Sequence, residues 1–190
     1  YGIALDERVI AYTKEVLKIA ENKTFDIIYA HHWMTFAAGV ELKKRFKKPL
    51  VVHVHSLSYD RVGVENNGWV NSLEKIGLNA ADCVIPVSNY TGRICTQYYQ
   101  VDYKKVYPVH NGIEKINTFK EQKAFPEKLV LFLGRVTSQK GPSLFLDIAS
   151  KVLEKNKDVR FVVAGAGDQL KEVIKEGAYR EIGNRLHFTG

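Results

Sequence analysis

A glycine-bounded loop, Gly134–Gly141, carries two basic residues where they could hold an anion. It follows the apolar run Lys128–Leu133, which predicts a buried strand, and precedes Pro142, which favours the first position of a helix. A helix N-terminus attracts anions through its free N–H groups and its dipole, and Arg135 and Lys140 add positive charge. The pattern predicts a phosphate or diphosphate site. The alternative is an ordinary strand–helix turn with two solvated cations.

Two better-known phosphate-binding motifs do not fit this sequence. A P-loop needs Ser or Thr soon after its second glycine, but Gly141 is followed by Pro142, so no hydroxyl is placed for a magnesium ion. The dinucleotide fingerprint needs a third glycine after Gly165 and Gly167, and Leu170 stands there instead. Kinase-like and dehydrogenase chemistry are therefore not favoured.

The composition is that of a globular protein with an anionic partner. The chain has 190 residues, 45% hydrophobic and 26% charged, which suits one large domain or two small ones. The net charge of +7 favours a nucleotide, a nucleic acid or an acidic membrane surface. The spacing of Cys83 and Cys95 matches no metal motif, so no metal site is expected. Two unpaired thiols and the lack of a signal peptide predict a cytoplasmic location.

Helical and strand patterns alternate along the chain, which predicts an α/β fold with parallel sheets. The predicted helices are Asp6–Glu21, Phe36–Phe46, Trp69–Leu78, Asn89–Tyr99, Pro142–Glu154 and Gln169–Glu176. The predicted strands are Phe25–Ala30, Leu50–His55, Asp82–Val87, Val106–Val109, Leu129–Leu133, Arg160–Ala164 and Arg185–Phe188. The segment Ser56–Gly68 is predicted to be a loop.

A polar stretch, Lys115–Lys123, interrupts this alternation and predicts a linker with a domain boundary near Glu114. The expected domains are therefore residues 1–114 and 115–190. In parallel α/β domains, loops at the carboxyl ends of the strands form the binding crevice. Such loops in the two halves carry these polar residues and glycines: His31, His32, His55, Ser56, Asp60, Asn111, Arg135, Gln139, Lys140, Gly165 and Gly167.

Five segments, in order, resemble motifs of one enzyme family. They are Ala30–Trp33, Val54–Tyr59, Asp82–Ser88, Asn111–Glu114 and Gly134–Gly141. Together they resemble the retaining GT-B glycosyltransferases of the GT4-like group, which includes glycogen and starch synthases, sucrose synthases and bacterial mannosyltransferases. One departure lies in the first segment, where His32 replaces the aspartate of the family's His-Asp-Trp sequence.

The resemblance implies two Rossmann-like domains and a sugar-transfer reaction. The implied reaction transfers a sugar from a nucleotide diphosphate sugar to a glycan or small acceptor, with retention of configuration. Glucose is the first expected sugar. UDP and ADP are the first expected donor nucleotides. The family needs no divalent ion to hold the diphosphate, so no metal and no cofactor is expected.

The resemblance also assigns roles to individual residues. Arg135 and Lys140 would hold the diphosphate and stabilise the charge that develops as the sugar leaves. His55 would contact the transferred sugar as a third catalytic residue, although a structural histidine at a strand end is the alternative. The implied donor-binding residues are Gly134, Arg135, Lys140, Gly165 and Gly167.

Further departures from the family predict that this chain is a central fragment of a glycosyltransferase and that it does not turn over a sugar donor by itself. The family's glycine-rich first loop has no match before Phe25, and its pair of sugar-binding glutamates would follow Gly190. A non-enzymatic nucleotide- or anion-binding module of the same fold is the alternative function.

Nucleic-acid binding is not expected, because aromatic residues do not interleave with the basic runs. The basic run Lys43–Lys48 predicts a solvated helix face, and a membrane-surface role is not favoured. An open sheet edge in the second half predicts self-association.

Overall fold

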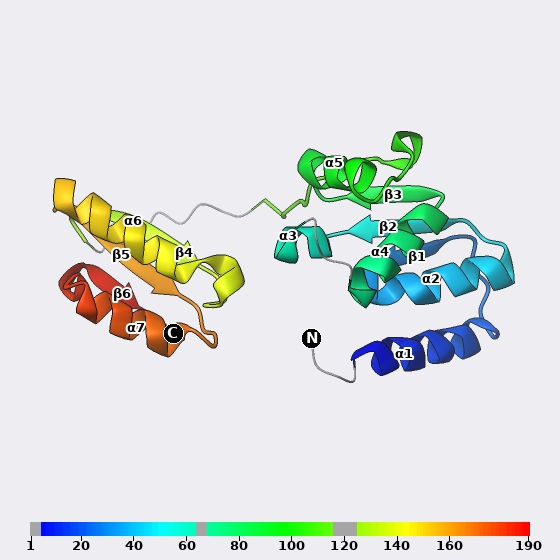
Figure 1. Cartoon of the computed structure of the whole chain (residues 1–190), viewed down its shortest axis with the longest axis horizontal. Helices are drawn as coiled ribbons and strands as arrows, with labels where there is room; N and C mark the ends of the chain where they lie inside the picture. Colours follow the sequence, from blue (N-terminus) through cyan, green and yellow to red (C-terminus); the bar gives the residue numbers. More distant parts are fainter. Residues whose placement is uncertain (1–4, 64–67, 116–124) are drawn as a thin grey trace. The chain divides into compact units, whose positions relative to one another are not determined.

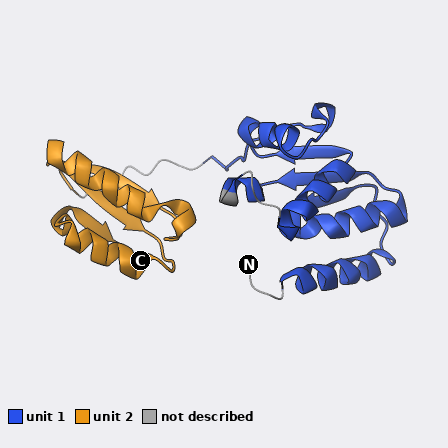
Figure 2. Cartoon of the chain, viewed as in Figure 1, with its two compact units in different colours: residues 1–115 blue, residues 116–190 orange. Residues whose placement is uncertain are grey.

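Buried apolar side chains form two separate cores, and the chain divides accordingly into unit 1, residues 1–115, and unit 2, residues 116–190 (Figure 2). The computed structural model describes residues 5–63, 68–115 and 125–190. The division falls next to Glu114, where the sequence predicts a domain boundary. Of the predicted linker Lys115–Lys123, only Lys115 lies within the described residues.

Unit 1 is a three-stranded parallel sheet with helices packed against it (Figure 1). The strand order is β1-β2-β3, so β2 is central and pairs with both neighbours. Helices α2 and α4 pack on the sheet and on each other, and α1 packs on α2. Its elements are α1 (Leu5–Ala20), β1 (Ile28–His31), α2 (Trp33–Phe46), β2 (Leu50–Val54), α3 (Ser58–Val62), α4 (Trp69–Ala80), β3 (Cys83–Pro86), α5 (Asn89–Gln97) and the 3-10 turn η1 (Tyr103–Lys105).

The two faces of β2 have different surroundings, because side chains alternate along a strand. Leu50, Val52 and Val54 are at most 1% exposed and face α2, whose Gly39 lies against Leu50. The opposite face carries His53, which lies beside His31 of β1 in the parallel register. The sequence of β2 therefore places Leu50, Val52 and Val54 in the core and leaves Val51 and His53 on the other face.

Two predictions for unit 1 were wrong. The predicted loop Ser56–Gly68 contains the short helix α3. The predicted strand Val106–Val109 forms a single parallel bridge, between Val106 and Val84 of β3. The main-chain N–H of Val109 donates to the carbonyl of Pro86 at 2.9 Å, but Pro86 has no N–H with which to return a bond. The ladder therefore ends after one bridge.

Unit 2 is a second three-stranded parallel sheet, with the order β4-β5-β6. The central strand β5 buries Val159, Phe161 and Val163 at alternate positions. These side chains belong to the same core as Leu146 and Ala149 of α6. Its elements are β4 (Lys128–Leu133), the turn η2 (Ser138–Lys140), α6 (Pro142–Lys155), β5 (Val159–Ala164), α7 (Leu170–Tyr179), the turn η3 (Gly183–Arg185) and β6 (Leu186–Phe188).

The prediction that β4 is buried was wrong. Within the described residues β4 is an edge strand, with Leu131 52% and Leu133 79% exposed. Phe132 is its inward contact, with its ring 5.5 Å from that of Phe145 in α6. An unbroken apolar run predicts burial on both faces, but among the residues that the structure describes only one face of β4 meets a helix. None of the helices in the described segments is both long and apolar enough to cross a membrane.

Candidate functional site

The predicted anion-binding loop connects β4 to α6. Gly141 has a φ of 66° and is the N-cap of α6, and Pro142 is the first helical residue. Glycine tolerates this left-handed conformation, and proline gives up no hydrogen bond at this position. The first turn of α6 has no side-chain capping bond and no acidic residue. Its positive end is therefore not compensated by a side chain and favours an anion.

The side chains of both basic residues in the loop are exposed to solvent and carry no ion pair with another described residue. Among the described residues, neither Arg135 nor Lys140 forms an ion pair or a side-chain hydrogen bond. Other arginines of unit 2 differ in this respect. Arg160 and Arg185 pair with one glutamate, and Arg180 pairs with two acidic residues. An unpaired guanidinium and ammonium beside an uncapped helix start are available to an external anion.

A second loop packs directly on the first, and its glycines make this contact possible. The main-chain N–H groups of Gly134 and Val136 donate to the carbonyls of Ala164 and Ala166 at 3.0 and 2.9 Å. A Cβ atom on Gly165 would lie 2.0 Å from the carbonyl oxygen of Gly134, and one on Gly167 would lie 2.1 Å from that of Val136. Crowding within the chain therefore explains both glycines, and their contact with a donor stays a prediction.

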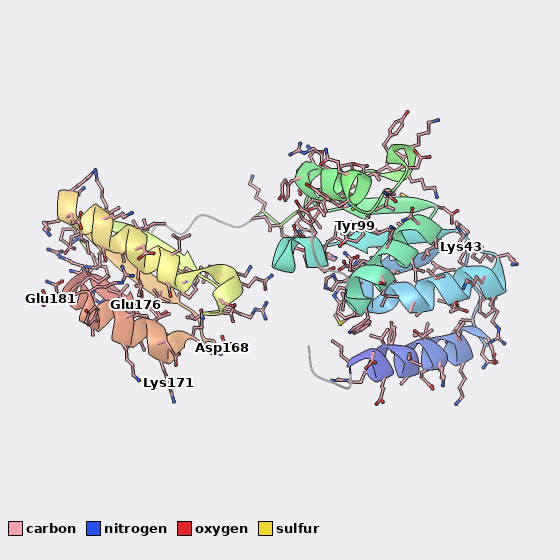
Figure 3. The ribbon with its side chains drawn as sticks, in the orientation of Figure 1. Lys43, Tyr99, Asp168, Lys171, Glu176 and Glu181 are labelled. Carbon is pink, nitrogen blue, oxygen red and sulfur yellow. The ribbon has the colours of Figure 1, made fainter. Side chains whose placement is uncertain are left out.

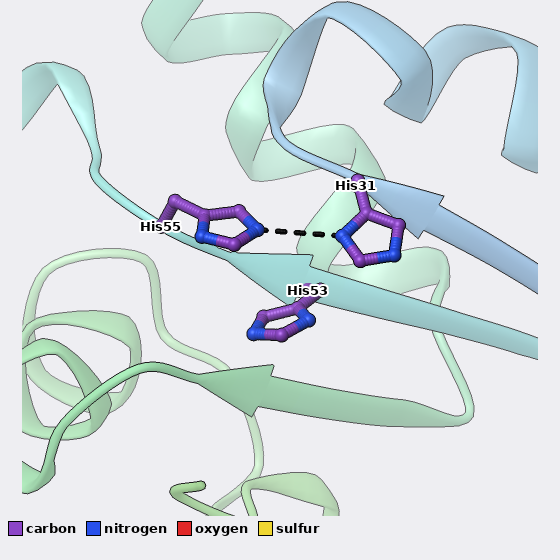
Figure 4. Close-up of side chains that lie close together, drawn as sticks. All are labelled: His31, His53 and His55. Atoms are coloured by element: carbon purple, nitrogen blue, oxygen red, sulfur yellow. Dashed lines mark hydrogen bonds between the residues drawn. The ribbon is translucent and has the colours of Figure 1, made fainter. Parts of the chain in front are cut away.

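In unit 1, three histidines meet near the carboxyl ends of β1 and β2 (Figure 4). Nδ1 of His31 and Nε2 of His55 lie 3.3 Å apart and share a hydrogen bond. The rings of His53 and His55 are stacked, with centroids 4.4 Å apart. Burial, and then the charges of His55 and His31, lower the pKa of His53, because protonating one ring disfavours protonation of the next.

His32 holds an unusual backbone conformation beside this cluster. Its φ is 65° and its ψ 156°, a region that residues other than glycine rarely adopt. Such a conformation costs on the order of 1–3 kcal/mol and often occurs at functional sites. It is held by the N–H of His32, which donates to the carbonyl of His53 at 2.9 Å, and by Thr35, whose hydroxyl reaches two neighbouring carbonyls. His32 occupies the N-cap position of α2 without a side-chain capping bond.

A buried carboxylate holds the segment that follows His55. Glu74 of α4 is fully buried and accepts hydrogen bonds from the main-chain N–H of Ser58 at 2.9 and 3.0 Å. The hydroxyls of Ser58 and of Tyr99, which follows α5 (Figure 3), also bond to Glu74. Burial and this carboxylate raise the pKa of Tyr99. Our sequence reasoning missed this network, although an acid within the apolar stripe Val70–Leu78 was a signal for it.

The other predicted polar residues have separate surroundings. Asp60 accepts a hydrogen bond from the main-chain N–H of Leu57 at 2.8 Å and so helps to begin α3. Asn111 and Gln139 are exposed, and Ser56 is half-buried. The structure thus brings His31, His32 and His55 together in unit 1, and it brings the two glycine loops together in unit 2. Sequence reasoning missed His53, for which the only signal was the alternation His53-Val54-His55 on a strand.

Comparison with known proteins identifies related sequences along both units. The model of a family described as Glycosyltransferase Family 4 matches residues 4–115, and that of Glycosyl transferases group 1 matches residues 114–190. An uncharacterized glycosyltransferase of Methanocaldococcus jannaschii is 28% identical over 184 residues, which cover 87% of this chain and 46% of that protein. The D-inositol 3-phosphate glycosyltransferase of Xylanimonas cellulosilytica is 23% identical, over 90% of this chain and 46% of that protein. The chain therefore spans about half the length of these relatives.

Solved structures show the same fold. A sucrose-phosphate synthase from Thermosynechococcus elongatus matches with a TM-score of 0.82 at 16% identity, over 99% of this chain and 50% of that one. TarM of S. aureus matches with a TM-score of 0.75 at 17% identity, over 92% of this chain and 35% of that one. At this level of identity the likeness concerns the fold alone, and it confirms the expected α/β class with two Rossmann-like parallel sheets.

Proposed function

Because this chain belongs to glycosyltransferase family 4, we propose that the protein transfers a sugar from a nucleotide diphosphate donor to a glycan or small acceptor. The related sequences that are named glycosyltransferases support this reaction class. They do not favour the alternative of a non-enzymatic nucleotide- or anion-binding module. The cytoplasmic location expected from the sequence stays a prediction.

The observation that carries the proposal is the loop at the start of α6. Arg135 and Lys140 are exposed and have no ion-pair partner among the residues that the structure describes, and they stand beside a helix N-terminus without a side-chain capping bond. The diphosphate of a nucleotide sugar carries two negative charges and has oxygens for both a guanidinium and helix N–H groups. We propose that this loop holds the donor diphosphate, and that Gly134, Gly165 and Gly167 shape the surface beside it.

The same charges would act on the chemical step. During transfer the bond between the sugar's C1 and the diphosphate breaks, and negative charge accumulates on the leaving diphosphate. The acceptor's hydroxyl oxygen bonds to C1 and gives up its proton to the leaving diphosphate. Fixed cations that interact more strongly with this developing charge than with the bound donor lower the barrier. In our proposal Arg135 and Lys140 supply this stabilisation, and His55 contacts the transferred sugar. No step of the proposal uses a metal ion.

The finer features of the reaction rest on the sequence resemblance and on what related proteins bind. We propose glucose as the sugar, UDP or ADP as the nucleotide, and retention of configuration. A structure of TarM contains UDP, which makes UDP the first nucleotide to test. Several relatives are named for D-inositol 3-phosphate, so this compound belongs beside a glucan in the acceptor panel.

The experiment compares Arg135→Ala and Lys140→Ala with Lys151→Ala, which removes the same charge from an exposed position of α6. UDP binding is measured by calorimetry. Because this chain is not expected to turn over by itself, transfer is measured in the whole protein, as glycosylated product from UDP-glucose and ADP-glucose. Losing a charge-assisted hydrogen bond of about 1.5–3 kcal/mol weakens UDP binding roughly 10–100-fold. Transfer should fall by about 100-fold or more. Lys151→Ala should behave as the parent. If both loop variants bind and turn over normally, the assignment is wrong.

A further inference from the structure

The histidine cluster of unit 1 has the composition and spacing of a transition-metal site. His31 of β1, His53 of β2 and His55 just after β2 each offer a ring nitrogen, and the three nitrogens all lie within 4.8 Å of one another. Imidazole is a common ligand of zinc, copper, nickel and iron. Three histidines and an open position make up a familiar zinc coordination set.

The distance between two of the nitrogens matches a shared ion. Zinc lies 2.0–2.1 Å from each histidine nitrogen, so two nitrogens on one tetrahedral zinc ion are about 3.3 Å apart. Nδ1 of His31 and Nε2 of His55 lie 3.3 Å apart. The third ring, that of His53, already stacks on His55. Rotation about the χ2 angle of a histidine meets only a low energy barrier. The backbone can therefore stay in place when the third nitrogen approaches.

The surroundings of His53 prepare its second nitrogen for an ion. Its Nδ1 forms a hydrogen bond with the Tyr29 hydroxyl at 3.0 Å. Its Nε2 is buried and has no hydrogen-bond partner within the described residues. A histidine ligand usually engages its other ring nitrogen in such a bond, which fixes the ring and its tautomer. When Nδ1 carries the proton and donates it to Tyr29, the lone pair of Nε2 is left for the metal.

The strand pairing fixes the positions of these side chains. His31 and His53 are directly paired residues of neighbouring parallel strands, and His55 lies two residues beyond His53 on the same face. The opposite face of β2 is sealed by the core, so the three rings stay on one side of the sheet. Two of the three are exposed, which gives an ion a path to the cluster.

We propose that His31, His53 and His55 bind one divalent transition-metal ion, with Zn²⁺ as the matching ion and a fourth position open to water. The ion displaces the hydrogen bond between His31 and His55 and takes one nitrogen from each ring. This site lies on unit 1, whereas the proposed diphosphate loop lies on unit 2. It therefore adds a ligand that the sequence did not predict, since the expectation of no metal rested on the cysteines and on the family.

The site has a consequence for transfer that rests on the proposed function. His55 is both a metal ligand here and the proposed contact of the transferred sugar. A zinc ion bound to the ring nitrogen of His55 should inhibit sugar transfer. Removing the ion with a chelator should then restore the transfer activity. Binding is measured without donor or acceptor, so a failure of the proposed reaction leaves the metal test intact.

The test titrates the chain, made without a histidine tag, with Zn²⁺ by calorimetry and with Co²⁺ by visible spectroscopy. We expect one equivalent of zinc to bind, and the intense visible bands of tetrahedral cobalt to appear. His53→Ala should weaken zinc binding at least about 10-fold and abolish the cobalt bands. Tyr29→Phe removes only the supporting bond and should weaken zinc binding by roughly 10-fold. His110→Ala, at an exposed histidine, and Cys83→Ser serve as controls and should bind as the parent.

Circular dichroism of each variant checks that unit 1 remains folded, and the cobalt spectrum of the parent needs no variant at all. The proposal is overturned if the parent gives no tetrahedral cobalt bands. It is also overturned if the triple variant His31→Ala, His53→Ala, His55→Ala binds zinc as tightly as the parent, because the ion would then bind elsewhere.

Discussion

Replacing Gly167 by alanine should destabilise unit 2 even when no ligand is present. The added Cβ would lie 2.1 Å from the carbonyl oxygen of Val136 and 2.6 Å from its carbon, and the obstacle is backbone rather than a flexible side chain. The two loops must therefore separate. Gly183 is the matched control, because it lies in the same unit and a Cβ there meets no atom within 4 Å.

The size of the effect follows from the contacts that separation breaks. Two hydrogen bonds converge on Val136: its N–H donates to Ala166 at 2.9 Å, and its carbonyl accepts from Gln169 at 3.1 Å. Each contributes about 0.5–1.5 kcal/mol, and backbone displacement adds roughly 1–3 kcal/mol. The free energy of unfolding should fall by about 2–6 kcal/mol, which is a large part of the stability of a small domain. At about 4–8 °C per kcal/mol, the midpoint of unit 2 should fall by at least roughly 8 °C.

The assay can separate the two units, because both tryptophans, Trp33 and Trp69, lie in unit 1. Far-ultraviolet circular dichroism reports both units, whereas tryptophan fluorescence reports unit 1. In Gly167→Ala, the dichroism should show an early transition while the fluorescence transition stays at the parent temperature. Gly183→Ala should shift neither transition. If the two variants unfold alike, the loop contact does not explain Gly167.

Three further predictions concern other parts of the chain. In the whole protein, His55→Ala should lower kcat more than it changes donor affinity; a loss of donor binding with normal turnover of the bound complex would contradict its proposed role. Hydrogen bonding and charge from Arg160, then Arg185, lower the pKa of Glu127 to about 2, against about 4.3 when unfolded. Its contribution to stability is therefore complete above about pH 4.3 and is lost as the pH falls toward 2, so Glu127→Gln should flatten the acid dependence of unit 2 melting; an unchanged slope would refute this. Leu131→Lys, at a half-exposed position of β4, should reduce self-association in sedimentation experiments; equal association of variant and parent would exclude this edge as the contact.

Local patterns predicted most elements of the fold because the physical causes are local. The 3.6-residue period, the Ser88 cap of α5, which accepts from the N–H of Thr91, and Pro142 at the start of α6 all act within one or two turns. The loop that carries Arg135 and Lys140 is predicted from the residues directly around it, namely the apolar run before Gly134 and Pro142 after Gly141. Its position between a strand and a helix could therefore be predicted without knowledge of the rest of the chain.

The errors arose where a distant residue decides the outcome. The segment Val106–Val109 reads as a strand by itself, and Pro86 in the neighbouring strand prevents the ladder. The apolar run of β4 does not reveal that the strand lies at an edge. The helix α3 depends on Glu74, which accepts a hydrogen bond from the main-chain N–H of Ser58. The two residues are 16 positions apart in the sequence. None of these partners can be identified from the segment that they affect.

The two candidate sites differ in the same way, and this difference governs how each can fail. The proposed anion site would use two cations of one loop and the N–H groups at the start of the helix that follows, so single substitutions in that loop should weaken it without disturbing unit 1. The histidine cluster depends on the pairing of His31 with His53 across two strands. A register shift of one residue would move His53 to the opposite face, where Leu50, Val52 and Val54 now fill the core. The apolar residues of β2 therefore help to hold the histidines in place, because the shift that separated the rings would also expose Leu50, Val52 and Val54.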